Sequence, residues 1–339
     1  VSRVTTMSNL FKSKYTFNED ISAWEMGQVT EIKGMFFHAQ TFNQNISAWK
    51  TAAITDMTSA FQSANAFNGD IALWNTASTT SFYAMFSSAT AFNQDIGRWN
   101  TGAATNLGYM FAQATAFNQD ISGWDVSSAL QIDAMFFGAA QFDQDLGQWD
   151  VSRVTTLRQT FRNAQSFTGM NLGKWDTGSV TIMERTFDAC YSLSSTVDFS
   201  SWDTSSVTNM VGMYSYARGI SGENQGFDSW NVSKVTSMEE MFHGAQAFTG
   251  SDIQLWDVSS VSDFSRMFRG AFLFTGDISS WDTSAATNMA GMFYNAHSFA
   301  ANLALWRTSS VTNFEGMFSS SRYNDPGILA WNTSKQGSL

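Results

Sequence analysis

The chain has 339 residues, of which 43% are hydrophobic, and a formal net charge of -11 at neutral pH. Binding to nucleic acid or to an anionic membrane surface needs clustered Lys and Arg, so an acidic chain with 18 scattered basic residues argues against both kinds of partner. The single cysteine, Cys190, excludes an internal disulfide and a paired-cysteine zinc site, and no apolar run reaches the roughly 20 residues of a membrane span.

The 13 tryptophans form one column of an internal repeat, because they recur at intervals of 25 to 28 residues. A fixed period of this length indicates a solenoid, in which each unit buries its apolar side chains by stacking on its neighbours. We predict a single solenoid over residues 1–339, with an irregular register within 167–230. Its structural spine is Trp24, Trp49, Trp74, Trp99, Trp124, Trp149, Trp175, Trp202, Trp230, Trp256, Trp281, Trp306 and Trp331.

The two ends of the sequence both fall within a repeat. The opening segment Val1–Thr6 recurs as Val151–Thr156 inside a unit, and the last tryptophan is followed by only the start of another unit. We therefore expect this sequence to be a segment of a longer protein.

Each unit is predicted to begin with a strand and a turn. The residues before the tryptophan alternate polar, apolar and polar, as in Asp70-Ile71-Ala72, which predicts a short parallel strand with its aliphatic side chain inward. Asp or Asn with Ser or Thr after the tryptophan supplies turn chemistry. The β-branched residues that follow, such as Val207 and Thr208, suit a second extended piece.

The rest of the unit is predicted to be a short helix and a loop. Apolar residues recur at spacings of four, three and three, as at Phe82, Phe86, Ala89 and Phe92, which indicates one face of a helix. The alanine column would let neighbouring helices approach closely, and Cys190 falls in that column as a small buried hydrophobe.

These columns resemble the BspA-type leucine-rich-repeat surface protein family, whose unit reads close to Asp-Ile-Ser-x-Trp-Asp-Val-Ser-x-Val-Thr-x-Met-x-x-Met-Phe-x-x-Ala. The match is clear in Asp120–Ser127 and Val235–Ala245 and extends over essentially the whole chain. The resemblance implies an α/β repeat solenoid that is leucine-rich-repeat-like, an extracellular or cell-surface location, and no catalytic residues. The chain departs from the family in using Trp throughout its column and in its eighth and ninth units.

A polar stripe precedes the inward aliphatic column. Carboxylates stacked at the strand spacing of about 4.8 Å repel one another, so the stripe needs a cation, a basic or polyhydroxylated partner, hydrogen-bond donors or good hydration. Two interpretations stay open: a ligand face, with Ca²⁺ as one candidate, or a solvated face that keeps the sheet soluble. The candidate ligand face is Asp20, Asp70, Asp95, Asp120, Asp145, Asp252 and Asp277.

Two further columns and one insertion complete the candidates. The asparagine column that includes Asn18, Asn43 and Asn68 predicts a buried ladder that satisfies backbone groups, and a threonine column suits extended backbone, with ice binding as the alternative. Extra residues between Tyr214 and Phe227 indicate an irregular loop, which is either a recognition site or a tolerated insertion. The candidate residues of that site are Tyr216, Arg218, Glu223 and Asn224.

The sequence contains few candidate catalytic residues. The three histidines are not grouped, and the acidic residues recur as columns rather than as one pair. We expect no enzyme activity and no cofactor, with Ca²⁺ the only candidate ion. The predicted function is a non-enzymatic extracellular module for adhesion or for protein or glycan interaction through a repeated polar face. The alternatives are a self-assembling element of a filament or sheath, built from copies joined end to end, and a Ca²⁺-dependent or ice-binding solenoid.

Overall fold

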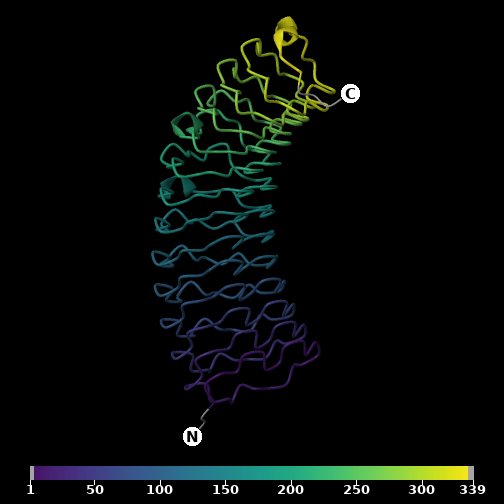
Figure 1. Ribbon diagram of the computed structural model, residues 1–339. Coiled ribbons are helices and arrows are strands. Elements are labelled where there is room, and N and C mark those ends of the chain that lie inside the picture. The colour runs from purple at the N-terminus through teal and green to yellow at the C-terminus, as the bar shows by residue number, and fades with distance from the viewer. Residues whose placement is uncertain (1–3, 335–339) are drawn as a thin grey trace. The chain divides into compact units, whose positions relative to one another are not determined.

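The computed structural model describes residues 4–334. It divides into two compact units, Val1–Met170 and Asn171–Leu339, called here the N-unit and the C-unit. In each unit the chain winds into successive coils, one sequence repeat per coil, that stack on one another (Figure 1). The expectation about the start of the sequence rests partly on residues 1–3, which lie outside the described part.

The predicted short helix is wrong. Across residues 4–334 the only helices are three 3₁₀ segments, η1 (Leu172–Lys174), η2 (Phe227–Ser229) and η3 (Pro326–Ala330). The segment with the four-three-three spacing instead forms consecutive β-turns, which we call the turn ladder. It runs from four residues before to three residues after the first aromatic of each repeat.

Hydrogen bonding explains why the turn ladder replaces a helix. Alternate N–H groups close turns within a coil, as from Ala64 to the carbonyl of Phe61 at 3.0 Å. The others cross to the next coil, as from Phe61 to the carbonyl of Met85 at 2.9 Å. A helix would satisfy its N–H groups within its own segment, whereas these turns use half of theirs to join neighbouring coils.

The turn ladder needs left-handed backbone twice per coil. Ser59 and Ser63, two residues either side of Phe61, have φ of 55° and 58°, as the third residue of a type II turn requires. Glycine adopts this conformation without strain, and it takes these positions in several coils. Those glycines are Gly34, Gly138, Gly212, Gly244, Gly270, Gly291 and Gly316.

The predicted strand before the tryptophan is also a turn. The N–H of Ala72 donates to Oδ1 of Asp70 at 3.0 Å, and the N–H of Trp74 donates to the carbonyl of Ile71 at 3.1 Å. Parallel pairing occurs instead in the second extended piece, through isolated bridges such as Asp56 to Ser81. The bridged residues are Thr6, Glu31, Asp56, Ser81, Asn106 and Gln131 in the N-unit and Ile182, Asn209, Ser237, Asp263, Asn288 and Asn313 in the C-unit.

The indoles form the predicted spine within each unit. Trp124 is 3% exposed, and its ring stacks on that of Trp99 with centroids 6.4 Å apart and planes 2° apart. Its Nε1 donates to the carbonyl of Ile96 in the preceding coil at 3.1 Å. Tryptophan therefore supplies both a large apolar surface and a buried donor, which explains why this column does not alternate with phenylalanine.

Two ladders of phenylalanine fill the rest of the core. Phe111 and Phe117 stack within one coil at 3.9 Å between centroids, and Phe111 stacks on Phe136 of the next coil at 5.8 Å. Rings in such offset stacks contribute beyond the area that they bury.

The core changes its pattern in the irregular stretch without losing aromatic rings. Leu193 and Ile220 occupy the second phenylalanine column, while Phe199 and Phe227 occupy the inward aliphatic column. The rings of Phe199 and Phe227 stack at 5.9 Å, and all four side chains are buried. Large and small side chains have exchanged columns, so the core volume is retained.

The role of the indole donor gives a direct prediction. Trp124→Phe removes one of the two donors to the buried Ile96 carbonyl, which keeps the N–H of Trp99, so we expect the lost hydrogen bond and the smaller ring to lower the free energy of unfolding by about 1–2 kcal/mol. Denaturant titration followed by far-ultraviolet circular dichroism measures the change. Gly123→Ala is the matched control, because a Cβ at Gly123 would meet no atom within 4 Å, and its effect should stay within about 0.5 kcal/mol.

Candidate functional site

The predicted ligand stripe consists mainly of turn-forming side chains. Oδ1 of Asp120 accepts the N–H of Ser122 at 2.9 Å, and hydrogen bonds from the Ser122 side chain and backbone hold the pKa of Asp120 below its usual value. Asp20, Asp70, Asp95, Asp145 and Asp277 make the same backbone contact two residues on. Hydrogen-bond donors within the same turn therefore stabilise these carboxylates.

Asp252 is the exception in this stripe, because its Oδ2 accepts the N–H of Gln225 from the preceding coil at 3.2 Å. Within residues 4–334, no group of three or more His, Cys, Asp or Glu side chains lies close enough together to hold a metal ion.

The asparagine column forms the predicted hydrogen-bonded ladder, but on the surface rather than in the core. The N–H of Asn43 donates to Oδ1 of Asn18 at 2.9 Å, and Asn68 repeats the contact with Asn43. These side chains are exposed, because the loop that carries them lies at the edge of the coil. The threonine column also joins coils, as where the Thr80 hydroxyl donates to the carbonyl of Thr55 at 3.2 Å.

The four residues of the predicted loop site fall into two places. Tyr216 lies in the turn ladder and Arg218 directly follows it, whereas Glu223 and Asn224 lie exposed on the loop beyond it. Within the described part of the chain, no hydrogen bond or ion pair joins the two pairs.

A residue that sequence reasoning missed organises this loop. Gln225 is fully buried, and its Oε1 accepts the N–H groups of Ser221 and Gly222, each at 2.9 Å. A glutamine between glycines in an insertion is the signal that would have indicated it, because buried polar groups must be hydrogen-bonded.

Aromatic and basic side chains gather instead on the outside of the turn ladder in the C-unit. We call this surface the ladder face, and it consists of Arg185, Asp188, Tyr191, Tyr216, Arg218, Glu239, Glu240, His243, Arg266, Arg269, Tyr294 and Glu315. In the N-unit the same columns hold small residues such as Ser63, Ser87 and Ala112 in some coils, and aromatic or basic residues such as Tyr83 and Arg162 in others. Sequence columns did not indicate them, because these outward positions differ from one repeat to the next.

Three aromatic pairs on the ladder face bridge successive coils. The guanidinium of Arg218 lies 5.0 Å from the ring centroid of Tyr191, and the Tyr216 hydroxyl is 3.3 Å from Nε2 of His243. A Cβ at Gly244 would lie 2.6 Å from the Tyr216 ring, so glycine makes room for that ring. The third pair is Arg269 over Tyr294, at 4.6 Å.

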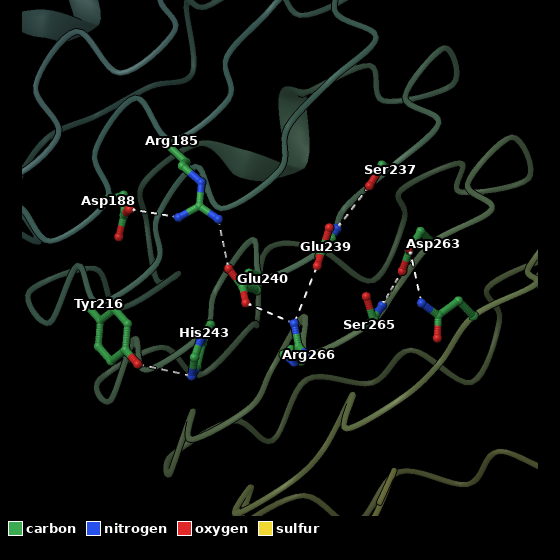
Figure 2. Close-up of polar contacts among 11 residues, drawn as sticks. Arg185, Asp188, Tyr216, Ser237, Glu239, Glu240, His243, Asp263, Ser265 and Arg266 are labelled. Atoms are coloured by element: carbon green, nitrogen blue, oxygen red, sulfur yellow. Dashed lines mark hydrogen bonds and ion pairs between the residues drawn. The ribbon is translucent and has the colours of Figure 1, made fainter. Parts of the chain in front are cut away.

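A chain of ion pairs fixes the charged residues of the ladder face (Figure 2). Arg185 contacts Asp188 through Nη1 and Glu240 through Nη2, each at 3.1 Å. Arg266 Nη1 contacts Glu240 at 3.3 Å and Glu239 at 3.5 Å. Burial and the neighbouring carboxylates of Asp263 and Glu240 raise the pKa of Glu239.

The ladder face also contains a cavity of about 220 Å³. Charged and aromatic side chains line it, together with two glycines that adopt left-handed turns. The lining residues are Arg266, Arg269, Ala290, Gly291, Tyr294, Glu315 and Gly316.

The family model described as "Mycoplasma protein of unknown function, DUF285" matches residues 1–95, 47–149, 70–170, 130–250 and 218–331. No curated protein shows significant sequence similarity to the chain.

Three solved structures of leucine-rich-repeat-like architecture are similar to the chain. In the complex of TLR13 with ssRNA13, the identity is 13%, with 88% of this chain and 50% of that chain covered and a TM-score of 0.26. An internalin from Listeria monocytogenes is 9% identical over 91% of this chain and 83% of its own, with a TM-score of 0.21. Toll from Drosophila, in complex with Spatzle, is 9% identical over 86% and 40%, with a TM-score of 0.21.

This chain therefore spans about half the length of the TLR13 chain that it matches. No helix within residues 4–334 has the length and apolar character that crossing a bilayer requires.

The half-buried ring of His243 gives a pH-dependent prediction. Burial lowers its pKa below 6.5, while Glu240 raises it. The folded state favours the neutral ring, so this contribution to stability is complete above pH 6.5 and is lost as the pH falls toward the folded-state pKa. NMR titration of the ring protons should give a pKa below that measured in denaturant, and Glu240→Gln should lower it further. A folded-state pKa at or above 6.5 would contradict this account.

Proposed function

The chain belongs to the family described as Mycoplasma protein of unknown function, DUF285, and we propose that it acts as a non-enzymatic interaction module at a cell surface. The proposed binding surface is the ladder face of the C-unit, rather than the aspartate stripe. The observation that carries the proposal is that exposed tyrosines, a ring-stacked arginine and a chain of ion pairs lie together on this face. The resemblance to BspA-type surface proteins supports the location.

The composition of the ladder face is typical of a recognition surface. Tyr191 and Tyr216 are 42% and 41% exposed in a protein that buries most of its aromatic rings. Tyrosine and arginine dominate binding energy at protein interfaces. Each tyrosine here contacts a residue of the next coil, so binding would cost little side-chain entropy.

The charged groups of this face favour binding over catalysis. Arg185, Glu240 and Arg266 form a continuous chain of ion pairs, and Asp188 closes one end of that chain. A catalytic acid or base needs a perturbed group that faces a substrate. In this network the carboxylates instead hold the two arginines in place, as in a surface that presents fixed donors.

Beads coated with the full chain test the proposal on immobilised extracellular glycoproteins and their deglycosylated forms. We expect retention that the double variant Tyr191→Ala/Tyr216→Ala reduces roughly tenfold or more, because each ring is a central contact. Loss on deglycosylation would indicate a glycan partner, and retention a protein partner.

The matched control is the double variant Ser88→Ala/Thr90→Ala, which changes the same two columns in the N-unit. It should bind as the wild type does. Equal loss in both double variants, or loss in neither, would rule out the ladder face as the binding surface. Circular dichroism melting curves confirm that each variant is folded.

A further inference from the structure

We propose that the cavity of the ladder face lined by Arg269, Tyr294 and Glu315 binds a sugar acid, meaning a pyranose unit that carries a carboxylate. This inference rests on the proposed function, because it names the chemical class that the same face recognises. The cavity has a volume of about 220 Å³, which is below the roughly 300 Å³ of the smallest drug-sized pockets. It therefore suits a single ring rather than an extended segment.

Arg269 supplies the charge for the ligand carboxylate. Of the two arginines in the cavity, Arg266 contacts Glu239 and Glu240. Within residues 4–334, no carboxylate lies at ion-pair distance from Arg269. Its guanidinium is held over the Tyr294 ring at 4.6 Å, which fixes the plane of the fork. A planar guanidinium held in this way presents paired N–H groups that match the two oxygens of a carboxylate.

Glu315 restricts the ligand to one that also carries hydroxyl groups. Its side chain is exposed and lines the cavity together with the arginines. A carboxylate only accepts hydrogen bonds, so it would repel a simple anion and accept bonds from sugar hydroxyls. Tyr294 adds an aromatic ring to the cavity wall, on whose apolar surface the C–H face of a sugar ring would pack. A sugar acid meets all three requirements, whereas an acidic peptide side chain lacks the hydroxyl groups.

Two lining glycines, Gly291 and Gly316, leave the cavity free of side chains at their positions. A Cβ at Gly291 would meet only Cγ of Arg266 at 3.6 Å and Cβ of Tyr294 at 4.0 Å, which are ordinary contacts. Ala84 and Ala134 take the equivalent left-handed position in other coils, so the turn accepts a side chain. Gly291→Ala therefore narrows the cavity without a clash inside the protein.

Calorimetry on the full chain with methyl glucuronide and with methyl glucoside, its neutral match, tests the inference. We expect the acid to bind roughly tenfold more tightly or better, because a hydrogen-bonded charge pair distinguishes the two sugars. Arg269→Gln should remove this difference, and Gly291→Ala should weaken the binding of both sugars.

Two matched controls separate the cavity from general effects. Arg162→Gln removes an arginine that occupies the same column in the N-unit and lies over the Phe137 ring at 5.6 Å, and Gly270→Ala imposes the same left-handed strain with its nearest atom at 3.8 Å. Both should bind the acid as the wild type does.

Equal affinity for the two sugars, no binding of either, or wild-type affinity in Arg269→Gln would overturn the inference. Arg269-dependent binding of N-acetylglutamate amide in place of the glucuronide would overturn it in favour of a peptide ligand. The proposed function is tested by a separate experiment, because glycoprotein retention that depends on Tyr191 and Tyr216 can persist when glucuronide does not bind. Glucuronide binding can equally persist when that retention is absent.

Discussion

The stacking of the coils depends on hydrogen bonds between one coil and the next. The backbone of the turn ladder donates every second N–H forward, and indoles such as those of Trp74, Trp124 and Trp281 donate backward to a carbonyl of the preceding coil. Stacking is therefore specified by direction and distance as well as by apolar burial. Because each coil is fixed on its neighbour, the outward positions carry no structural duty and are free to vary. That freedom lets one coil differ from the next, and in the C-unit it brings tyrosines, arginines and carboxylates into contact on one face.

The repeat and its buried columns could be predicted from the sequence, because burial repeats with the coil. Apart from members in the end coils such as Trp24 and Trp331, the tryptophan spine, the two phenylalanine columns and the small column at Cys190 are buried as expected. The secondary structure could not be read from the same columns. Apolar residues spaced by four, three and three suit one face of a helix, but they equally suit a ladder of turns in which every third or fourth side chain points inward. Glycines such as Gly244 and Gly270 were the local signal, because a helix does not use left-handed residues.

The functional residues of the candidate site were harder to predict from the sequence than the buried columns were. The aspartate stripe was visible because it is periodic, and its periodicity comes from turn formation at residues such as Asp120. Apart from Tyr216 and Arg218, the ladder face could not be predicted, because its columns hold different residue types from coil to coil, as Arg269 and Tyr294 do in one column. A periodic polar residue in a solenoid therefore first indicates a backbone requirement. The residues that distinguish one coil from another are better candidates for recognition.

The exchange between Leu193 and Phe199, and between Ile220 and Phe227, has a consequence for how such chains diverge. Restoring phenylalanine at Leu193 alone would crowd the core beside Phe199, and replacing Phe199 by an aliphatic residue alone would leave a void. Either single substitution would destabilise the core. The two positions must therefore change together, or through an intermediate residue that the core accepts. Within a repeat array, the two core positions of one coil then evolve as a pair. Sequence families of this kind should show covariation between these two columns.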